Sequence, residues 1–224
     1  MPAVEHIGAL SSIKPRTVID VGANKGQFSL VAHYLFPDAK IHAFEPLESE
    51  RRIYQSVISG PVQIQSIALG AEKGTANFFV ASSADSSCLL APGKGQEAAY
   101  GVGLSSTTTV SVDRFDNVMS TTELVAPVLL KLDVQGAELQ VLRGSEGILP
   151  HVDAVYCEVS FVELYERQPK ASAIVSFLDR HGFTLSGVFN LSVTRKFGPT
   201  QADFLFRRNG ETDDQAPSCK HADR

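Results

Sequence analysis

The sequence predicts an α/β fold, with a mostly parallel central sheet and helices on both of its faces. Short apolar segments that end in an acid or a turn alternate with longer segments whose apolar residues follow helical spacing. The alternation lapses near the middle of the chain and resumes at residue 127. Strands that are joined through helices pair in parallel, and helices then cover the sheet on both faces.

The first unit of this pattern begins with the segment T-V-I-D-V at 17–21. Its β-branched residues favour a buried strand. Gly22 and Gly26 then permit a tight turn in which the backbone can approach a ligand closely. From Gln27 the apolar residues follow helical spacing, so we expect a helix whose first N–H groups face the turn.

The remaining elements follow from the same two periods, with Pro37, Pro150 and Gly182 as stops. Strands are expected at 40–44, 62–68, 74–80, 107–112, 127–133, 154–158, 183–191 and 202–207, and helices at 47–59, 138–148 and 171–181. The last two strands are expected to form an antiparallel hairpin at the edge of the sheet.

The chain is expected to form one main domain at 16–208. Residues 1–15 suggest a short amphipathic helix that covers one edge of it. An insertion is expected at about 74–112, where two β-rich segments enclose a Ser-, Gly- and Ala-rich loop at 81–106 without a helix. Loops of this length are usually functional, so we expect it on the substrate side. The polar tail at 209–224 is expected to be disordered.

Composition limits the classes of function. The 224 residues are 43% hydrophobic and 20% charged, which suits one sizeable core. A net charge of -5 without a dense Lys/Arg cluster argues against nucleic-acid binding, so a small or neutral substrate is expected. The three separated cysteines fit neither a disulfide framework nor a zinc site. With no recognisable signal peptide or membrane span, we expect a cytoplasmic protein, whose oligomeric state the sequence leaves open.

Two acids mark the ends of the first two strands. Asp20 ends the first strand and Glu45 ends the second. Ligands of open parallel sheets bind beyond the carboxyl ends of the strands, where an acid after the second strand can accept hydrogen bonds from both hydroxyls of a ribose. The alternative is that each acid caps its own turn or the following helix. The first interpretation predicts a cofactor that carries a nucleoside.

The glycine turn helps to distinguish between such cofactors. Dinucleotide sites use G-x-G-x-x-G to approach a pyrophosphate, whereas Asn24 stands here in place of the middle glycine. Asp20 also adds a negative charge before the turn, which suits a cation or an amino group. S-adenosylmethionine carries a sulfonium, an amino group and a ribose, so Asp20, the N–H groups of the turn and Glu45 suit it as a set. A nicotinamide-dependent oxidoreductase is the alternative.

Four motifs, in order, carry a resemblance to a known family. They are D-V-G-A-N-K-G at 20–26, A-F-E-P at 43–46, K-L-D-V-Q-G-A-E-L with V-L-R-G at 131–144, and D-F-L-F at 203–206. From Thr17 to Phe206 the chain resembles the FkbM-type methyltransferases. The resemblance implies a Rossmann-like class I fold, S-adenosylmethionine as cofactor, and O-methylation of hydroxyls on sugars or small natural products.

The resemblance also implies roles for individual residues. The cofactor loop would comprise Asp20, Gly22, Asn24 and Gly26, with Glu45 as the ribose acid. The edge beside the adenine would run from Ser66 to Ala68, and Asp133 would face the methyl group.

The end of the strand at 127–133 carries the candidate catalytic residues. Asp133 can orient or deprotonate an attacking hydroxyl, or it can cap the helix that follows. Lys131 is unusual in an apolar strand and needs an acidic partner, for which Glu158 and Glu138 are candidates; it serves either this ion pair or catalysis. Glu158 ends the next strand and points to the same edge.

Asp133 and Glu158 could together bind a divalent cation, since oxygen ligands suit magnesium. The sequence offers no third ligand, so a metal is not expected. The leading prediction is an S-adenosylmethionine-dependent methyltransferase that acts on a hydroxyl. A noncatalytic protein that binds the cofactor is a further alternative.

Overall fold

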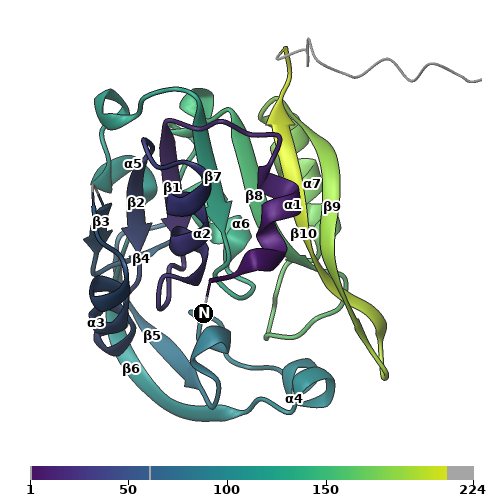
Figure 1. The fold of residues 1–224 in the computed structure, drawn as a ribbon. Coiled ribbons are helices and arrows are strands. Elements are labelled where there is room, and N and C mark those ends of the chain that lie inside the picture. The colour runs from purple at the N-terminus through teal and green to yellow at the C-terminus, as the bar shows by residue number, and fades with distance from the viewer. Residues whose placement is uncertain (1, 61, 211–224) are drawn as a thin grey trace, which may run out of the picture.

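The computed structural model describes residues 2–60 and 62–210. Its main sheet has seven strands in the order β3-β2-β1-β7-β8-β10-β9 (Figure 1). They are β1 (Thr17–Val21), β2 (Lys40–Phe44), β3 (Val62–Gln65), β7 (Val128–Leu132), β8 (Ala154–Ser160), β9 (Phe183–Thr194) and β10 (Gly198–Arg208). The first five in this order are parallel, and β10 is antiparallel to both β8 and β9. The predicted α/β class and its C-terminal hairpin are confirmed.

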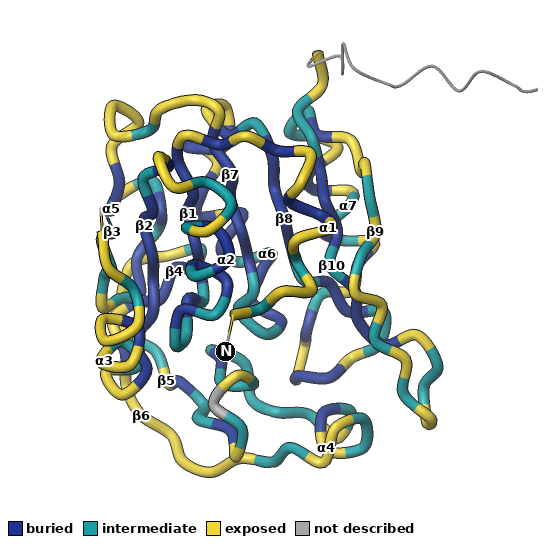
Figure 2. Tube along the Cα trace, viewed as in Figure 1, coloured by how far each residue is buried: buried dark blue, intermediate teal, exposed yellow. Residues whose placement is uncertain are grey.

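Helices cover both faces of this sheet, and the central strands are buried between them (Figure 2). One face carries α1 (Ile7–Leu10), which follows the 3-10 turn η1 (Val4–His6), together with α2 (Gln27–Leu35) and α3 (Glu48–Val57). The other carries α5 (Phe115–Val118), α6 (Glu138–Arg143) and α7 (Ala171–Arg180). Two short 3-10 turns precede strands in sequence: η3 (Thr121–Glu123) precedes β7, and η4 (Leu149–His151) precedes β8.

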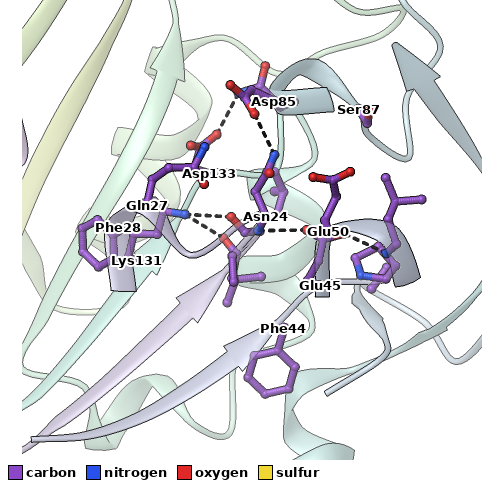
Figure 3. A pocket seen from close by; sticks show the side chains of 18 of the residues that line it. Asn24, Gln27, Phe28, Phe44, Glu45, Glu50, Asp85, Ser87, Lys131 and Asp133 are labelled. Carbon is purple, nitrogen blue, oxygen red and sulfur yellow. Dashed lines mark hydrogen bonds between the residues drawn. The ribbon is translucent and has the colours of Figure 1, made fainter. Parts of the chain in front are cut away.

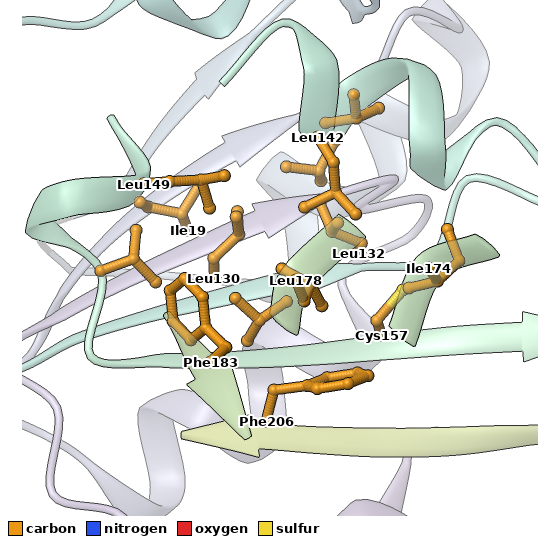
Figure 4. Packing of buried hydrophobic residues seen from close by; sticks show 14 of the residues in the cluster. Ile19, Leu130, Leu132, Leu142, Leu149, Cys157, Ile174, Leu178, Phe183 and Phe206 are labelled. Atoms are coloured by element: carbon orange, nitrogen blue, oxygen red, sulfur yellow. The ribbon is translucent and has the colours of Figure 1, made fainter. Parts of the chain in front are cut away.

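The alternation of side chains along each strand separates an apolar face from a partly polar one. Ile19, Leu130 and Cys157 belong to the large cluster beneath α6 and α7 (Figure 4). The residues next to them in sequence point to the face of α1 and α2, because successive side chains in a strand point to opposite faces. That second face therefore holds Asp20, Lys131, Glu158 and Asp203.

A second, smaller sheet lies beyond the carboxyl ends of β1 and β2 (Figure 1). Its strands, in the order β4-β6-β5, are β4 (Ala68–Leu69), β5 (Gly74–Ala81) and β6 (Leu104–Asp113). The predicted strand at 62–68 is therefore wrong as one element, since its two ends pair in different sheets. The turn η2 (Ala84–Ser86) and the helix α4 (Lys94–Tyr100) follow β5.

Two further predictions need correction. The loop at 81–106 was expected to lack a helix, but it contains α4, a short helix with a glycine inside it and little apolar periodicity. The predicted helix at 138–148 ends at Arg143. Its end is crowded, because a Cβ on Gly144 would lie 2.0 Å from the carbonyl oxygen of Gly70.

Both ends of the chain bear on the predictions. The amphipathic segment forms η1 and α1, which contact the edge strand β9 and bury Leu10 in the cluster that includes Phe28 and Tyr156. Most of the tail expected to be disordered, 211–224, lies outside the described residues. Among residues 2–60 and 62–210, no helix combines the length and hydrophobicity needed to cross a membrane.

Candidate active site

A cavity of about 420 Å³ opens at the carboxyl ends of β1, β2 and β7 (Figure 3). Five segments line it: the N-terminal residues, the turn after β1, the residues after β2, the small sheet and the residues after β7. The residues that line it include Glu5, His6, Gly22, Asn24, Phe28, Glu45, Glu50, Ile67, Ala68, Leu69, Phe78, Asp85, Leu89, Lys131, Asp133 and Gln135. The predicted position at the ends of the parallel strands is where the cavity lies.

The turn after β1 packs directly against the end of β7. Gly22 has a φ of +76°, and a Cβ at this position would lie 1.9 Å from the carbonyl oxygen of Asp133. Only glycine fits such a contact. Gly26 also has positive φ, but it faces Ile58 and Tyr54 and does not line the cavity.

Every N–H group of this turn is bonded within the protein. Those of Gly22 and Ala23 donate to Phe44 O, that of Asn24 to Glu45, that of Lys25 to the Asn24 side chain, and that of Gly26 to Ala23 O. The expectation that these groups would serve a ligand is therefore wrong. A pyrophosphate site needs N–H groups that point at the anion, and those of residues 22–26 are already engaged.

Glu45 is buried at the end of β2 and is held by backbone donors. Its Oε2 accepts from Asn24 N at 3.0 Å, and its Oε1 accepts from Leu47 N at 2.7 Å. Burial raises the pKa of Glu45 to about 7, although the two hydrogen bonds oppose this shift. Each carboxylate oxygen has two lone pairs, so both can accept a further hydrogen bond from a ligand.

Lys131 pairs with Asp20 and not with either acid expected from the sequence. Its Nζ lies 2.9 Å from Asp20 Oδ1 and donates to Gly22 O at 2.9 Å, while Ser29 Oγ donates to Asp20 Oδ2 at 2.6 Å. Burial opposes the charge of Lys131, but Asp20 and Asp133 outweigh it and keep its pKa above the ordinary value. Asp20 and Lys131 are direct neighbours on β1 and β7. Asp20 thus lies behind the turn and does not line the cavity.

The side chain of Gln135 joins the two remaining candidate carboxylates. Its Nε2 donates to Asp133 Oδ1 at 2.7 Å and to Glu158 Oε2 at 3.0 Å, while Tyr165 donates to its Oε1. Burial raises the pKa of Asp133, and it raises that of Glu158 further with the help of the Asp133 charge. Asp133 lines the cavity, whereas Glu158 does not.

Two alternatives from the sequence can now be compared with this geometry. The capping alternative for Asp133 is wrong, because Ala137 is the N-cap of α6 and no side chain caps it. The other alternative is a divalent cation shared by Asp133 and Glu158. In the structure, the NH₂ group of Gln135 lies between these two carboxylates and donates a hydrogen bond to each. Within the part of the chain that the structure describes, no three His, Cys, Asp or Glu side chains are grouped as metal ligands.

Of the other residues expected in the cofactor site, Asn24 and Ala68 line the cavity but Ser66 does not. His6 was not expected in the site, but it lines the cavity, and its Nδ1 lies 3.3 Å from Asp203 Oδ2. Asp203 opens the D-F-L-F motif, to which no role was given. A histidine outside any motif offers no local signal, and only the fold brings it to the cavity.

Comparison with known proteins decides the family. The model of the methyltransferase FkbM domain matches residues 20–185, which is more than half of the chain. The chain belongs to the FkbM methyltransferase family. It is therefore an S-adenosylmethionine-dependent methyltransferase, as the motifs predicted.

Individual relatives of this FkbM methyltransferase are distant. The 31-O-demethyl-FK506 methyltransferase FkbM of Streptomyces tacrolimicus is 27% identical over 203 residues, which cover 75% of this chain and 72% of that protein. The AMB antimetabolite synthetase AmbE of Pseudomonas aeruginosa is 30% identical, but the chain spans only 10% of its length. A solved structure of a putative S-adenosylmethionine dependent methyltransferase from Listeria monocytogenes has the same fold, with a TM-score of 0.50 and 10% identity over 92% of this chain and 99% of that one.

The cavity suits S-adenosylmethionine by its chemistry. One part is apolar, with Ile67, Leu69, Phe78 and Leu89 on the side of the small sheet. The rest is rich in carboxylates, which come from Glu5, Glu45, Glu50, Asp85 and Asp133. A cofactor with an apolar base at one end and a sulfonium and an amino group at the other matches this division of charge.

Proposed function

We propose that this FkbM methyltransferase transfers the methyl group of S-adenosylmethionine to a hydroxyl of a sugar or a small natural product. The observation that carries the proposal is the Asp133 carboxylate, which lines the same cavity as Glu45 but comes from the opposite side of the turn. The relative from Streptomyces tacrolimicus is named for a 31-O position, which supports oxygen as the acceptor atom.

The roles of the cofactor residues follow from their positions in the cavity. Glu45 accepts hydrogen bonds from the ribose hydroxyls, and the small sheet around Ala68 packs against the adenine. Asn24 narrows the cavity, because its Nδ2 donates to Asp85 Oδ1 at 3.1 Å. Lys131 holds the turn through Gly22 O and does not take part in the reaction. The bound cofactor supplies an activated methyl group on a sulfonium.

Asp133 then acts on the acceptor. A buried carboxylate beside the sulfonium stabilises the positive charge that develops on the attacking hydroxyl oxygen as it bonds to the methyl carbon. Gln135 holds this carboxylate and links it to Glu158 on β8. Glu158 thereby becomes a positioning residue.

The free, buried thiols of Cys88 and Cys157 support the cytoplasmic location expected from the sequence.

The test is methyl transfer to paired acceptors. The purified protein is incubated with S-adenosylmethionine carrying tritium in its methyl group and with a panel of methyl glycosides, macrolide alcohols and hydroxylated amino acids. Each alcohol is matched by the amine of the same skeleton. We expect label in alcohols and not in their amines. Label in amines alone would overturn oxygen as the acceptor atom. Tight binding of S-adenosylhomocysteine without transfer to any acceptor would favour the noncatalytic alternative.

A further inference from the structure

His6 and Asp203 lie within ion-pair distance of each other at the wall of the cavity, and both contact Tyr156. The Nδ1 atom of His6 lies 3.3 Å from Asp203 Oδ2 and 2.9 Å from the hydroxyl oxygen of Tyr156. Only 17% of the His6 side chain and 13% of the Asp203 side chain are exposed. His6 lines the same cavity as Asp133 and Lys131. An imidazole beside a buried carboxylate thus lines the same cavity as the candidate catalytic carboxylate.

The surroundings of Asp203 fix the protonation pattern of this pair. Its Oδ2 accepts from Tyr156 OH at 2.9 Å and from Asn190 Nδ2 at 2.7 Å. Burial raises the pKa of Asp203, but the hydrogen bonds from His6, Asn190 and Tyr156 lower it by more, so the carboxyl stays ionised. Tyr156 OH gives its hydrogen to Asp203 and so accepts from His6 Nδ1 at 2.9 Å. We therefore assign the ring hydrogen to Nδ1, although the donor Asn190 Nδ2 also lies 3.2 Å from it. The Nε2 atom then carries a free lone pair.

Aromatic contacts fix the plane of the His6 ring. It lies edge-on to Phe28 and to Tyr156, with both pairs of ring centroids 5.5 Å apart. Phe28 in turn packs under Lys131, whose Nζ is 5.4 Å from the ring centroid. Glu5 Oε1 lies 4.0 Å from His6 Nε2. The ring is therefore held in one orientation, with its basic nitrogen away from Asp203.

We propose that Nε2 of His6 is the base that takes the proton of the acceptor hydroxyl, with Asp203 as its positioning residue. This inference rests on the proposed hydroxyl methylation and assigns the proton acceptor within it. The hydroxyl oxygen, next to the Asp133 carboxylate, forms a bond to the methyl carbon while the carbon–sulfur bond breaks and leaves its electron pair on sulfur. The hydroxyl proton moves to Nε2. The products are a methyl ether, S-adenosylhomocysteine and an imidazolium that releases its proton to water.

The test separates the base from a merely structural contact. His6→Asn keeps a donor in the place of Nδ1, next to Tyr156 OH and Asp203, but it removes Nε2. With the alcohol that gives the highest turnover in the tritium assay, we expect kcat to fall about 100-fold or more. The Kd for S-adenosylhomocysteine, measured by calorimetry, is expected to stay within about threefold, because the segment remains anchored. His151→Asn, at an exposed position on η4, serves as the control and should change neither value.

Two further readouts address the mechanism directly. Added imidazole should restore turnover to His6→Ala, because a free base can enter the space of the deleted ring. In the wild-type complex with S-adenosylhomocysteine, long-range ¹H–¹⁵N NMR should place the ring hydrogen on Nδ1. In Asp203→Asn it should show a mixture of tautomers, together with a fall in kcat that imidazole does not reverse.

Three results would overturn the assignment: a kcat for His6→Asn within threefold of wild type, no rescue of His6→Ala by imidazole, or a ring hydrogen on Nε2. A wild-type protein that transfers no label to any acceptor would overturn the proposed function instead. The NMR measurement would still decide whether Nε2 can accept a proton.

Discussion

The two sides of the cavity are held together in different ways. On the side of β1 and β2, backbone groups bond to one another and to Glu45, so the turn keeps its shape through the main chain. On the side of β7, β8 and β10, side chains from distant strands bond to one another through Gln135 and Glu158. A site held by backbone hydrogen bonds keeps its shape when side chains differ, which suits a cofactor shared by all members of a family. A site held by side-chain hydrogen bonds changes with each substitution, which suits an acceptor that differs between members.

The side-chain network continues outward from Glu158. Gln201 Nε2 donates to Glu158 Oε2 at 3.0 Å, and Tyr100 OH donates to Gln201 Oε1 at 2.8 Å. The Tyr100 hydroxyl also lies 2.9 Å from Ser192 Oγ. The network thus runs from Asp133 to the surface between α4 and the β9–β10 hairpin. We infer that this side receives the acceptor, and four changes probe the contrast between the two sides.

The largest effect is expected where the two sides meet, at Lys131. Lys131→Met would leave Asp20 buried without its cation, and such a loss typically costs about 3–5 kcal/mol. It would also release Gly22 O, so the turn should loosen. Urea unfolding measures the change in the free energy of unfolding.

Two companion variants show whether the ion pair itself matters. The double variant Asp20→Asn/Lys131→Met should recover part of the stability, because it removes the buried charge as well. Arg52→Ala breaks only an exposed pair with Glu48 and should cost less than about 1 kcal/mol. A Lys131→Met protein as stable as wild type would contradict the role of Lys131 as the link between the two sides.

The next effect concerns chemistry on the acceptor side. Asp133→Asn should lower kcat about 100-fold, because an amide cannot stabilise the positive charge that develops on the attacking hydroxyl. The Kd for S-adenosylhomocysteine should change little, since the backbone holds the cofactor side. The tritium assay at saturating cofactor gives kcat, and calorimetry gives Kd. If Asp133→Asn bound S-adenosylhomocysteine more weakly but kept its kcat, Asp133 would belong to the cofactor side, and the assignment of the β7 side to the acceptor would be wrong.

A smaller effect is expected on the cofactor side. Glu45→Gln should weaken the binding of S-adenosylhomocysteine about tenfold, because an amide loses charge-assisted hydrogen bonds to the ribose. Since the pKa of Glu45 is about 7, wild-type affinity should rise between pH 6 and pH 8 as the carboxyl ionises. The Glu45→Gln variant should lose this dependence. Calorimetry at both pH values makes the test, and an equal pH dependence in both proteins would contradict it.

Glu45 also affects the stability of the fold. Its contribution to the free energy of unfolding falls as the pH rises, whereas cofactor affinity is expected to increase. Its pKa in the folded protein lies above its ordinary value of 4.5. Between about pH 4.5 and pH 7, the folded state therefore binds more protons at Glu45 than the unfolded state does. The contribution of Glu45 to the free energy of unfolding is full below this interval and is lost as the pH rises through it. Glu138 is buried at the start of α6 with a pKa also raised to about 7, and it adds to the same trend.

The local parts of this molecule could be predicted from the sequence, but the contacts between distant parts could not. The helix α2 and the strand β2 lie where the spacing of apolar residues placed them. The partner of Lys131 required the order of the strands, because Asp20 is 111 residues away in sequence and adjacent only through the β1–β7 pairing. His6 reaches the cavity only because η1 packs against α2 and β9. Sequence spacing reports periods within a segment and carries no direct information about which segments meet.

The smallest effect is expected at the outer end of the side-chain network. Tyr100→Phe removes one hydroxyl that donates to Gln201 and leaves the ring in place. Because Tyr100 is partly exposed, water can replace the lost donor, so the free energy of unfolding should change by less than about 1 kcal/mol. The KM for the acceptor should rise by a few-fold while the Kd for S-adenosylhomocysteine stays constant, since no backbone bond of the cofactor side involves α4. Steady-state kinetics with the alcohol found in the tritium assay measure the first value. An unchanged KM combined with a weaker Kd would place the acceptor elsewhere and connect α4 to the cofactor instead.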